Sequence, residues 1–282
     1  MRNIFRSVVL CAVFCGALHT EPSQDIESLS PLAQSYFVIE TKTIGEYKLF
    51  LAKPKTTHAK PYPILVVLDG NAHFPFVINQ YIMHQYTPTQ EPLFIAGIGY
   101  DGDLAYDVPR RTRDYTPIVR DTKGGGAKAF YEVLQTQIMP LIQQAYCTES
   151  SSTLDSIVES PCAKPTDIAF FGHSFGGLFG LYVFLHHQEM FTYYMIASPS
   201  LWWGGINIDA LDTCESKIVF TKGTQEPHKG GILFSDFVKA LYAKCPNTHI
   251  YAQYFHGGHG DTIKASIPLV LSDLLIKSDD TQ

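Results

Sequence analysis

The sequence has little positive charge, few cysteines and no apolar run long enough to cross a membrane. Its 282 residues include 21 basic and 27 acidic side chains, which gives a formal net charge of −6 at pH 7. This balance argues against nucleic acid as a partner, because nucleic-acid interfaces are strongly basic. A membrane-spanning helix needs about 20 consecutive apolar residues, and the apolar stretch 7–18 is too short. The absence of internal repeats and long linkers favours a single large core.

The N-terminal segment is typical of a secretory signal peptide. Two arginines precede the apolar stretch and a polar stretch follows it. We therefore expect residues 1–20 to be removed, and residues 21–282 to form one exported domain, periplasmic or secreted, with a net charge of −8. A lipid anchor on Cys11 or Cys15 is an alternative, but a bulky residue stands directly before each, where lipoprotein processing prefers small ones.

Four cysteines remain in the exported chain, and an even number in such a protein indicates disulfides. Cys214 and Cys245 each precede an expected strand, so two neighbouring parallel strands would bring them to one edge of a sheet. Cys147 and Cys162 bracket a polar, serine-rich insert. We therefore predict the pairs Cys147–Cys162 and Cys214–Cys245. A zinc site is the alternative, although no Cys-x-x-Cys spacing is present.

Apolar runs alternate with helix-period segments along the chain, which predicts an α/β fold with a mostly parallel central sheet and helices on both faces. The later runs are continuously apolar, as in strands buried on both sides. The first two strands are expected to form an antiparallel hairpin about Gly45. The expected strands are 35–39, 47–52, 64–68, 93–97, 168–171, 193–197, 218–221 and 249–255, and the clearest helices are 127–146 and 232–242.

Ser174 lies between glycines in the sequence Gly172-His-Ser-Phe-Gly176, directly after the apolar run 168–171. A strand that turns at once into a helix holds the serine at strained backbone angles, and flanking glycines avoid collisions. Such a turn exposes the serine Oγ and directs the first helical amides toward a developing oxyanion. The pattern predicts the nucleophile elbow of a serine hydrolase, with a glycine-rich packing turn as the alternative.

A serine nucleophile needs a base and usually an acid, which in α/β-hydrolases follow in the order serine, acid, histidine. His259 lies in a glycine-rich loop after the last strand and is the predicted base, with His256 as second choice. Neutral imidazole can take the serine proton near neutral pH and return it to the leaving group. Glu226, on the loop after strand 218–221, is the predicted acid. The alternatives for the acid are Asp236 and Asp261.

An oxyanion hole requires two backbone donors. One is the amide of Phe175, directly after the nucleophile. The other is the amide of Asn71, or of Gly70, at the turn after strand 64–68. The alternative is an ordinary strand-to-helix connection in which Asp69 satisfies nearby N–H groups.

Several separate motifs together resemble the putative-esterase branch of the α/β-hydrolases. Relatives in that branch include trilactone siderophore esterases, S-formylglutathione hydrolases, feruloyl esterases and mycolyltransferases, and the resemblance is greatest on the siderophore-esterase side. It covers about residues 35–275, and the insert 148–161 departs from it. The motifs are LDGN at 68–71, GIGY at 97–100, RTRDYTP at 111–117, GHSFGGLF at 172–179, SPSLWW at 198–203, GTQE at 223–226 and His259.

The resemblance implies an α/β-hydrolase fold, Ser174 as nucleophile, His259 as base, and the amides of Asn71 and Phe175 as oxyanion donors. Some siderophore-esterase relatives work with serine and histidine alone, which leaves the role of Glu226 open.

The resemblance also implies that Arg111 anchors substrate or a loop, by forking onto Asp114 or onto a substrate carboxylate. A purely structural ion pair is the alternative. Trp202 and Trp203 are expected to line the pocket and hold an aromatic acyl group, although core packing explains at least one of them equally well. A basic cleft for a catechol trilactone could come only from Arg110, Arg111, Arg113 and Arg120.

These features together predict an exported serine esterase that cleaves a small-molecule ester through an acyl-enzyme intermediate. They imply no metal or organic cofactor, no nucleic-acid partner and no membrane segment in the mature chain. A siderophore-type ester is one candidate substrate. An acyltransferase using the same nucleophile and a non-catalytic binding protein on the same fold are the alternative functions.

Overall fold

A computed structural model describes residues 23–55, 61–84, 92–147, 164–211, 214–246 and 249–275. The predicted signal peptide and Cys162 lie outside the described residues. Within these ranges, no helix is both long enough and apolar enough to span a bilayer.

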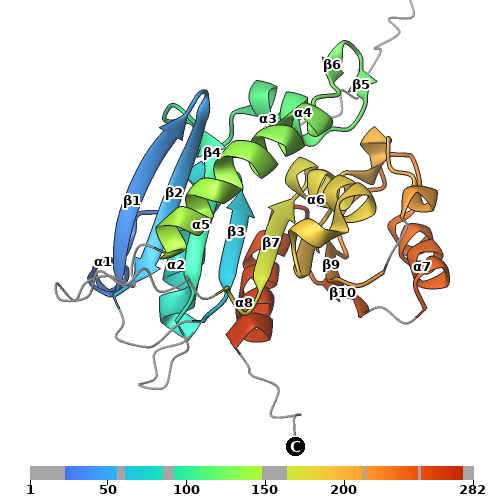
Figure 1. Ribbon diagram of the computed structural model, residues 1–282. Coiled ribbons are helices and arrows are strands. Elements are labelled where there is room, and N and C mark those ends of the chain that lie inside the picture. The colour runs from blue at the N-terminus through green and yellow to red at the C-terminus, as the bar shows by residue number, and fades with distance from the viewer. Residues whose placement is uncertain are drawn as a thin grey trace, which may run out of the picture.

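An eight-stranded sheet forms the centre of the molecule (Figure 1). The first two strands in its order are antiparallel to their neighbours, and the remaining pairs are parallel. The predicted mostly parallel sheet with an N-terminal hairpin about Gly45 is therefore confirmed. The order is β1 (Phe37–Ile44), β2 (Tyr47–Pro54), β4 (Phe94–Tyr100), β3 (Ile64–Leu68), β7 (Ile168–His173), β8 (Tyr193–Ala197), β9 (Lys217–Gly223) and β10 (Ile250–Phe255).

Helices cover both faces of the sheet and enclose two apolar cores. One core joins the sheet to α4 (Ala127–Val133), α5 (Met139–Cys147), α6 (Phe175–His186) and α7 (Phe234–Lys244). The other joins it to α1 (Pro31–Tyr36), α2 (Gly70–His84) and α8 (Asp261–Leu275). Side chains of β3 alternate between the two cores, which is why its sequence is apolar at every position.

The remaining elements are short. They are α3 (Val108–Tyr115), the two-stranded hairpin of β5 (Val119–Arg120) and β6 (Lys123–Gly124), a π-helical turn at Leu134–Ile138 between α4 and α5, and 3₁₀ turns at Gln188–Met190, Leu201–Trp203 and Ile208–Ala210.

The start of the first strand differs from the expectation. Ser35 belongs to α1, which begins after Ser30, whose side chain accepts a hydrogen bond from the Ala33 amide. Pro31 occupies the first turn of α1, where its missing N–H costs nothing. Because the helix continues to Tyr36, β1 begins at Phe37, and it extends beyond the expected end to Ile44.

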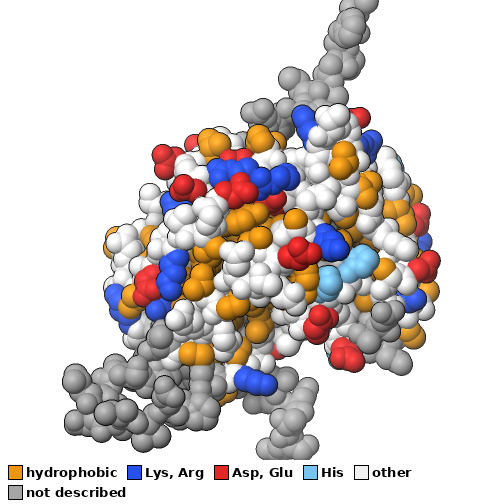
Figure 2. Space-filling view, turned by 45° about the horizontal axis from the view of Figure 1, so that its top comes forward, with side chains coloured by type: hydrophobic (Ala, Val, Ile, Leu, Met, Phe, Trp, Pro, Cys, Tyr) orange, Lys and Arg blue, Asp and Glu red, His pale blue; other side chains and the backbone are white. Residues whose placement is uncertain are grey.

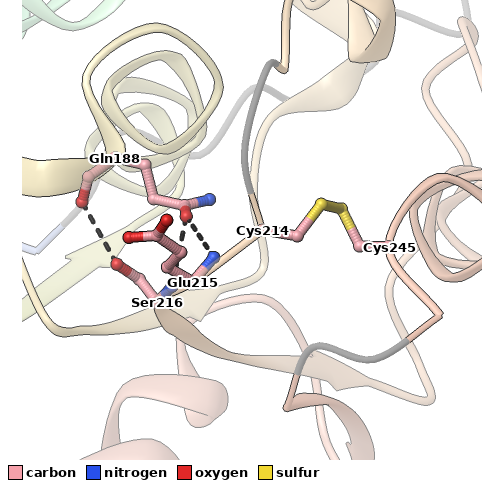
Figure 3. Close-up of a disulfide and its surroundings, with 5 residues drawn as sticks. All are labelled: Gln188, Cys214, Glu215, Ser216 and Cys245. Carbon is pink, nitrogen blue, oxygen red and sulfur yellow. Dashed lines mark hydrogen bonds between the residues drawn. A yellow bond between two sulfur atoms is a disulfide. The ribbon is translucent and has the colours of Figure 1, made fainter.

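The predicted disulfide Cys214–Cys245 is present, with Cα atoms 5.7 Å apart (Figure 3). It joins the segment before β9 to the residue that ends α7, and β9 and β10 are parallel neighbours as expected. Beside it, the Gln188 Oε1 atom accepts the amides of Glu215 and Ser216 at 2.6 and 3.1 Å (Figure 3). The segment leading into β9 is thus fixed by covalent and hydrogen bonds. The pairing Cys147–Cys162 stays a prediction, because Cys162 lies outside the described residues.

Candidate active site

Ser174 lies between the end of β7 and the start of α6, with φ of 60° and ψ of −117°. This is a strained backbone conformation for a residue with a side chain. A Cβ atom at Gly172 would come within 2.3 Å of the Gly176 carbonyl oxygen, so glycine is required there. At Gly176 the expected collision is wrong, since a Cβ would lie 3.5 Å from Leu68, an ordinary contact. The strand, turn and helix together have the geometry of a nucleophile elbow.

The Ser174 hydroxyl has a partner that the sequence did not indicate. Its Oγ lies 3.2 Å from Oγ of Ser200, on the loop after β8. The Ser200 amide also donates to the Ser174 carbonyl at 3.1 Å. Among the described residues, no hydrogen bond joins Ser174 Oγ to the His259 ring.

Glu226 and His259, predicted from separate loops, are in direct contact. Nδ1 of His259 lies 2.9 Å from Oε2 of Glu226. The loop that carries His259 joins β10 to α8. The backbone carbonyl of His259 accepts hydrogen bonds from Nε2 of His173 at 2.8 Å and from Oγ1 of Thr262 at 2.7 Å. Because a carbonyl only accepts, the proton of His173 is on Nε2. Two side chains therefore fix the backbone beneath the His259 ring.

The alternative residues for base and acid are placed elsewhere. His256 is exposed and contacts the side chain of Gln225 at 3.4 Å. Asp261, the first residue of α8, accepts the amide of Gly258 at 2.8 Å. Asp236 is on α7, 3.8 Å from Lys239. None of these contacts joins an alternative residue to Glu226 or Ser174.

Four donors surround the Glu226 carboxylate, which is only 6% exposed. Oε1 accepts the Gly223 amide at 2.8 Å and the Ser198 hydroxyl, and Oε2 accepts His259 and Lys222 Nζ, each at 2.9 Å. Burial raises the pKa of Glu226, but these four hydrogen bonds outweigh burial and hold its pKa well below the usual range. The carboxylate is therefore ionised and keeps a proton on Nδ1 of His259, which leaves Nε2 free to accept one.

Ser200, Glu226 and His259 line one cavity of about 210 Å³ at the carboxyl ends of the strands. In Figure 2, which turns the top of Figure 1 forward, exposed histidine side chains lie beside acidic and basic ones. Ser200, whose hydroxyl contacts Ser174, and the predicted base His259 therefore border the same space.

The predicted oxyanion donors open two helices that start at neighbouring strand ends. Asn71 is the second residue of α2, and Phe175 is the first residue of α6. Amides in the first turn of a helix have no acceptor within the helix. The Asn71 side chain bonds both the amide and the carbonyl of Tyr100, at 2.9 and 3.0 Å, which anchors the start of α2.

Arg111 does not pair with Asp114, and its guanidinium forms the structural ion pair that was the alternative expectation. Arg111 is buried and donates two hydrogen bonds of 2.9 Å to Asp69. Asp114 instead accepts Arg113 and the hydroxyls of two tyrosines. Asp69 directly precedes α2 and accepts both hydrogen bonds of the Arg111 guanidinium. Arg111 therefore fixes the turn that carries Asn71.

The two tryptophans have different environments. Trp202 lines the cavity, and its ring lies 5.5 Å from the Arg120 guanidinium and 5.7 Å from Lys229 Nζ. Trp203 is buried and donates its Nε1–H to the Ile118 carbonyl at 2.9 Å. Core packing, the alternative expected for at least one of the two tryptophans, therefore accounts for Trp203.

Among the described residues, none of the four arginines of the expected basic cluster lines this cavity. Arg110 pairs with Asp107, Arg111 and Arg113 have the partners given above, and Arg120 donates to the Trp202 carbonyl at 2.6 Å. The lysines that line the cavity are Lys222 and Lys229. Both lysines lie within four residues of Glu226 in the sequence, and this spacing could have identified them as residues of the site.

A family model described as putative esterase matches residues 41–228. The chain belongs to this family. Apo-salmochelin esterase of Escherichia coli O6:H1 is 27% identical over 254 residues, which is 81% of this chain and 74% of that protein. The ferri-bacillibactin esterase BesA of Bacillus subtilis is 27% identical over 173 residues, 56% of this chain and 54% of that protein. The predicted carboxylic ester hydrolase is confirmed at the level of the family.

Two solved structures have the same fold as this chain. The BES protein from Bacillus cereus superposes with a TM-score of 0.67 at 21% identity, over 92% of this chain and 99% of that one. The enterobactin and salmochelin hydrolase IroE gives 0.62 at 25% identity, over 86% and 98% of the two chains. The predicted α/β-hydrolase fold is therefore confirmed.

Proposed function

We propose that the protein is an exported serine esterase in which Ser174, His259 and Glu226 hydrolyse a carboxylic ester through an acyl-enzyme intermediate. The observation that carries the proposal is the 2.9 Å contact between His259 and Glu226, beside the cavity that Ser200 shares with them. An ionised, buried carboxylate on a histidine ring is the arrangement that lets the ring activate a serine hydroxyl.

The reaction begins when Ser174 Oγ attacks the ester carbonyl and its proton passes to Nε2 of His259. This requires Oγ to turn from Ser200 toward His259 by rotation about the Cα–Cβ bond, and such catalytic contacts commonly tighten only when substrate binds. The amides of Asn71 and Phe175 stabilise the tetrahedral oxyanion. His259 then returns the proton to the leaving alcohol, and a water molecule repeats the sequence to release the acid.

A siderophore-type ester with aromatic acyl groups is the substrate we propose. The Trp202 ring offers a flat apolar surface to an aromatic group. Lys222 and Lys229 line the same cavity and would attract negative charge on that group. Relatives named as salmochelin and bacillibactin esterases support this choice.

Export is supported by the disulfide Cys214–Cys245, since disulfides persist in oxidising compartments. We expect protein recovered outside the cytoplasm to begin near residue 21. Its N-terminal sequence tests this, and recovery of the intact N-terminus in the cytoplasm alone would contradict it.

The proposal is tested by Ser174→Ala, with Ser35→Ala as the matched loss of an exposed hydroxyl on α1. We expect Ser174→Ala to lower kcat/KM by at least about 1,000-fold and to abolish labelling by a fluorophosphonate probe. Ser35→Ala should behave as the wild type in both assays. Equal labelling of wild type and Ser174→Ala would refute the catalytic role of Ser174.

Substrate choice is measured with nitrophenyl esters, feruloyl esters and a catechol trilactone. Turnover confined to the trilactone would support the siderophore-type ester, and fast turnover of short acyl esters alone would contradict it. Intact-mass measurement during turnover should detect an acyl adduct in the wild type and none in Ser174→Ala.

A further inference from the structure

The carboxylate oxygen that contacts the predicted base also contacts a lysine. Oε2 of Glu226 lies 2.9 Å from Nδ1 of His259 and 2.9 Å from Nζ of Lys222. The ammonium group is therefore within about 6 Å of the imidazole, a range in which charges shift each other's titration by whole pH units. A bare carboxylate would stabilise the imidazolium more strongly than one shared with a cation.

Two features hold Lys222 in this place. It is the penultimate residue of β9, so its backbone is fixed by the sheet, and its Nζ lies 5.8 Å from the ring centre of Phe234 on α7. Its side chain is 24% exposed, which leaves its charge only partly screened by water. Lys222 is therefore a fixed charge beside the predicted base.

The other titratable groups around His259 come from several elements. His173, at the end of β7, is buried with its ring centre 4.6 Å from that of His259, and burial is the main reason that its pKa lies well below the ordinary histidine value. It is therefore neutral and adds no full charge. The other groups are Glu226, His228 and Lys229 from the loop after β9, His256 from the loop that carries His259, and Asp261 at the start of α8.

We propose that Lys222 is a positioning residue that lowers the proton affinity of His259 by sharing the Glu226 carboxylate with it. The inference rests on the proposed function, because it assigns a role within the same site. The shared carboxylate keeps His259 unprotonated, and thus able to accept the Ser174 proton, at lower pH than a simple histidine–carboxylate pair would allow.

The test is the pH profile of kcat/KM for Lys222→Met, Lys222→Gln and Lys222→Arg. Loss of the charge should raise the apparent pKa of the acid limb by about 1. Below that limb, kcat/KM should then fall about tenfold further than in the wild type. Lys222→Gln keeps a hydrogen-bond donor without charge and should shift the limb as Lys222→Met does, while Lys222→Arg should restore the wild-type profile.

Lys217→Met is the matched control, because Lys217 is on the same strand and pairs with Asp273 at the same 2.9 Å. Its profile should match the wild type. A purely structural role for Lys222 would lower activity equally at every pH, and an unmoved acid limb in both neutral variants would overturn the proposal. If Lys222→Met fails to fold, Lys222→Gln carries the test.

The same measurements separate this inference from the proposed function. Full activity in Ser174→Ala would refute the esterase mechanism whatever Lys222 does. An inactive Ser174→Ala combined with an unmoved limb in the Lys222 variants would leave the esterase mechanism intact and refute only the role of Lys222.

Discussion

Replacing Glu226 by glutamine probes whether the site works as a triad or as a serine–histidine dyad. The carboxylate accepts two donors on each oxygen, so a glutamine amide must turn its NH₂ group toward two of them in either orientation. In one orientation the NH₂ group opposes Lys222 and His259. In the other it opposes the Gly223 amide, while Ser198 can turn its hydroxyl to accept. The charge is lost in both orientations, together with one or two of the four hydrogen bonds.

The expected cost follows from these contacts. Hydrogen bonds to a charged group contribute about 1.5–3 kcal/mol each. Because Lys222 is partly exposed and can turn to water, losing the charge and one or two of the four bonds should lower the free energy of unfolding by about 2–4 kcal/mol. Loss of the carboxylate that sets the His259 tautomer should lower kcat by about 100- to 10,000-fold.

The pH dependence of stability gives an independent readout. The folded-state pKa of Glu226 lies below its unfolded value, so the unfolded chain binds more protons in that interval. The stability that Glu226 confers is therefore complete above about pH 4.3 and is lost as the pH falls below it. Urea unfolding across this range should show a shallower decline in Glu226→Gln than in the wild type.

The assays are steady-state ester hydrolysis and urea unfolding near neutral pH, with Glu215→Gln as the matched loss of an exposed carboxylate. Glu215→Gln should change stability by less than about 0.5 kcal/mol and leave kcat unchanged. Glu226→Asp, which keeps the charge but shortens the side chain, should fall between the wild type and Glu226→Gln. The triad would be refuted, and a dyad supported, if a folded Glu226→Gln kept a kcat within about threefold of the wild type. The triad predicts a loss of at least roughly 100-fold.

Two further predictions concern stability. Arg111→Met should lower the free energy of unfolding, measured in urea, by about 3–5 kcal/mol, because it leaves the buried Asp69 carboxylate without its cation. The control Lys239→Met breaks an exposed pair and should lower it by at most about 1 kcal/mol. Equal losses in the two variants would contradict the structural role of Arg111. Replacing Cys214 and Cys245 together by serine should cost about 3–4 kcal/mol, as expected for a 31-residue separation, and an unchanged urea midpoint would show that the bond contributes nothing.

The strands and the elbow could be predicted because their signals are local. Residues 64–68 are apolar at every position since β3 is covered on both faces, and no other element explains such a run next to a glycine turn. The elbow at Ser174 requires a glycine at Gly172 for steric reasons that operate within five residues. The pair Cys214–Cys245 followed from the expected order of two neighbouring strands.

The partners of charged side chains could not be predicted in the same way. Arg111 lies three residues from Asp114 in the sequence, yet it pairs with Asp69, forty-two residues away. The helix α3 directs Arg111 toward the start of α2, while Asp114 is taken by Arg113. Which of two nearby carboxylates an arginine meets depends on how helices pack, and spacing along the chain does not record that.

The sequence by itself determined the α/β alternation, the sharp turn at Ser174 and the candidate residues Ser174, Glu226 and His259, because periodicity, glycine and strand ends act over a few residues. Only the tertiary structure decided that Ser200 contacts Ser174 and that Lys222 shares the carboxylate of Glu226 with His259. These contacts join loops after different strands, and their distances depend on how the whole sheet twists and on how its two cores pack.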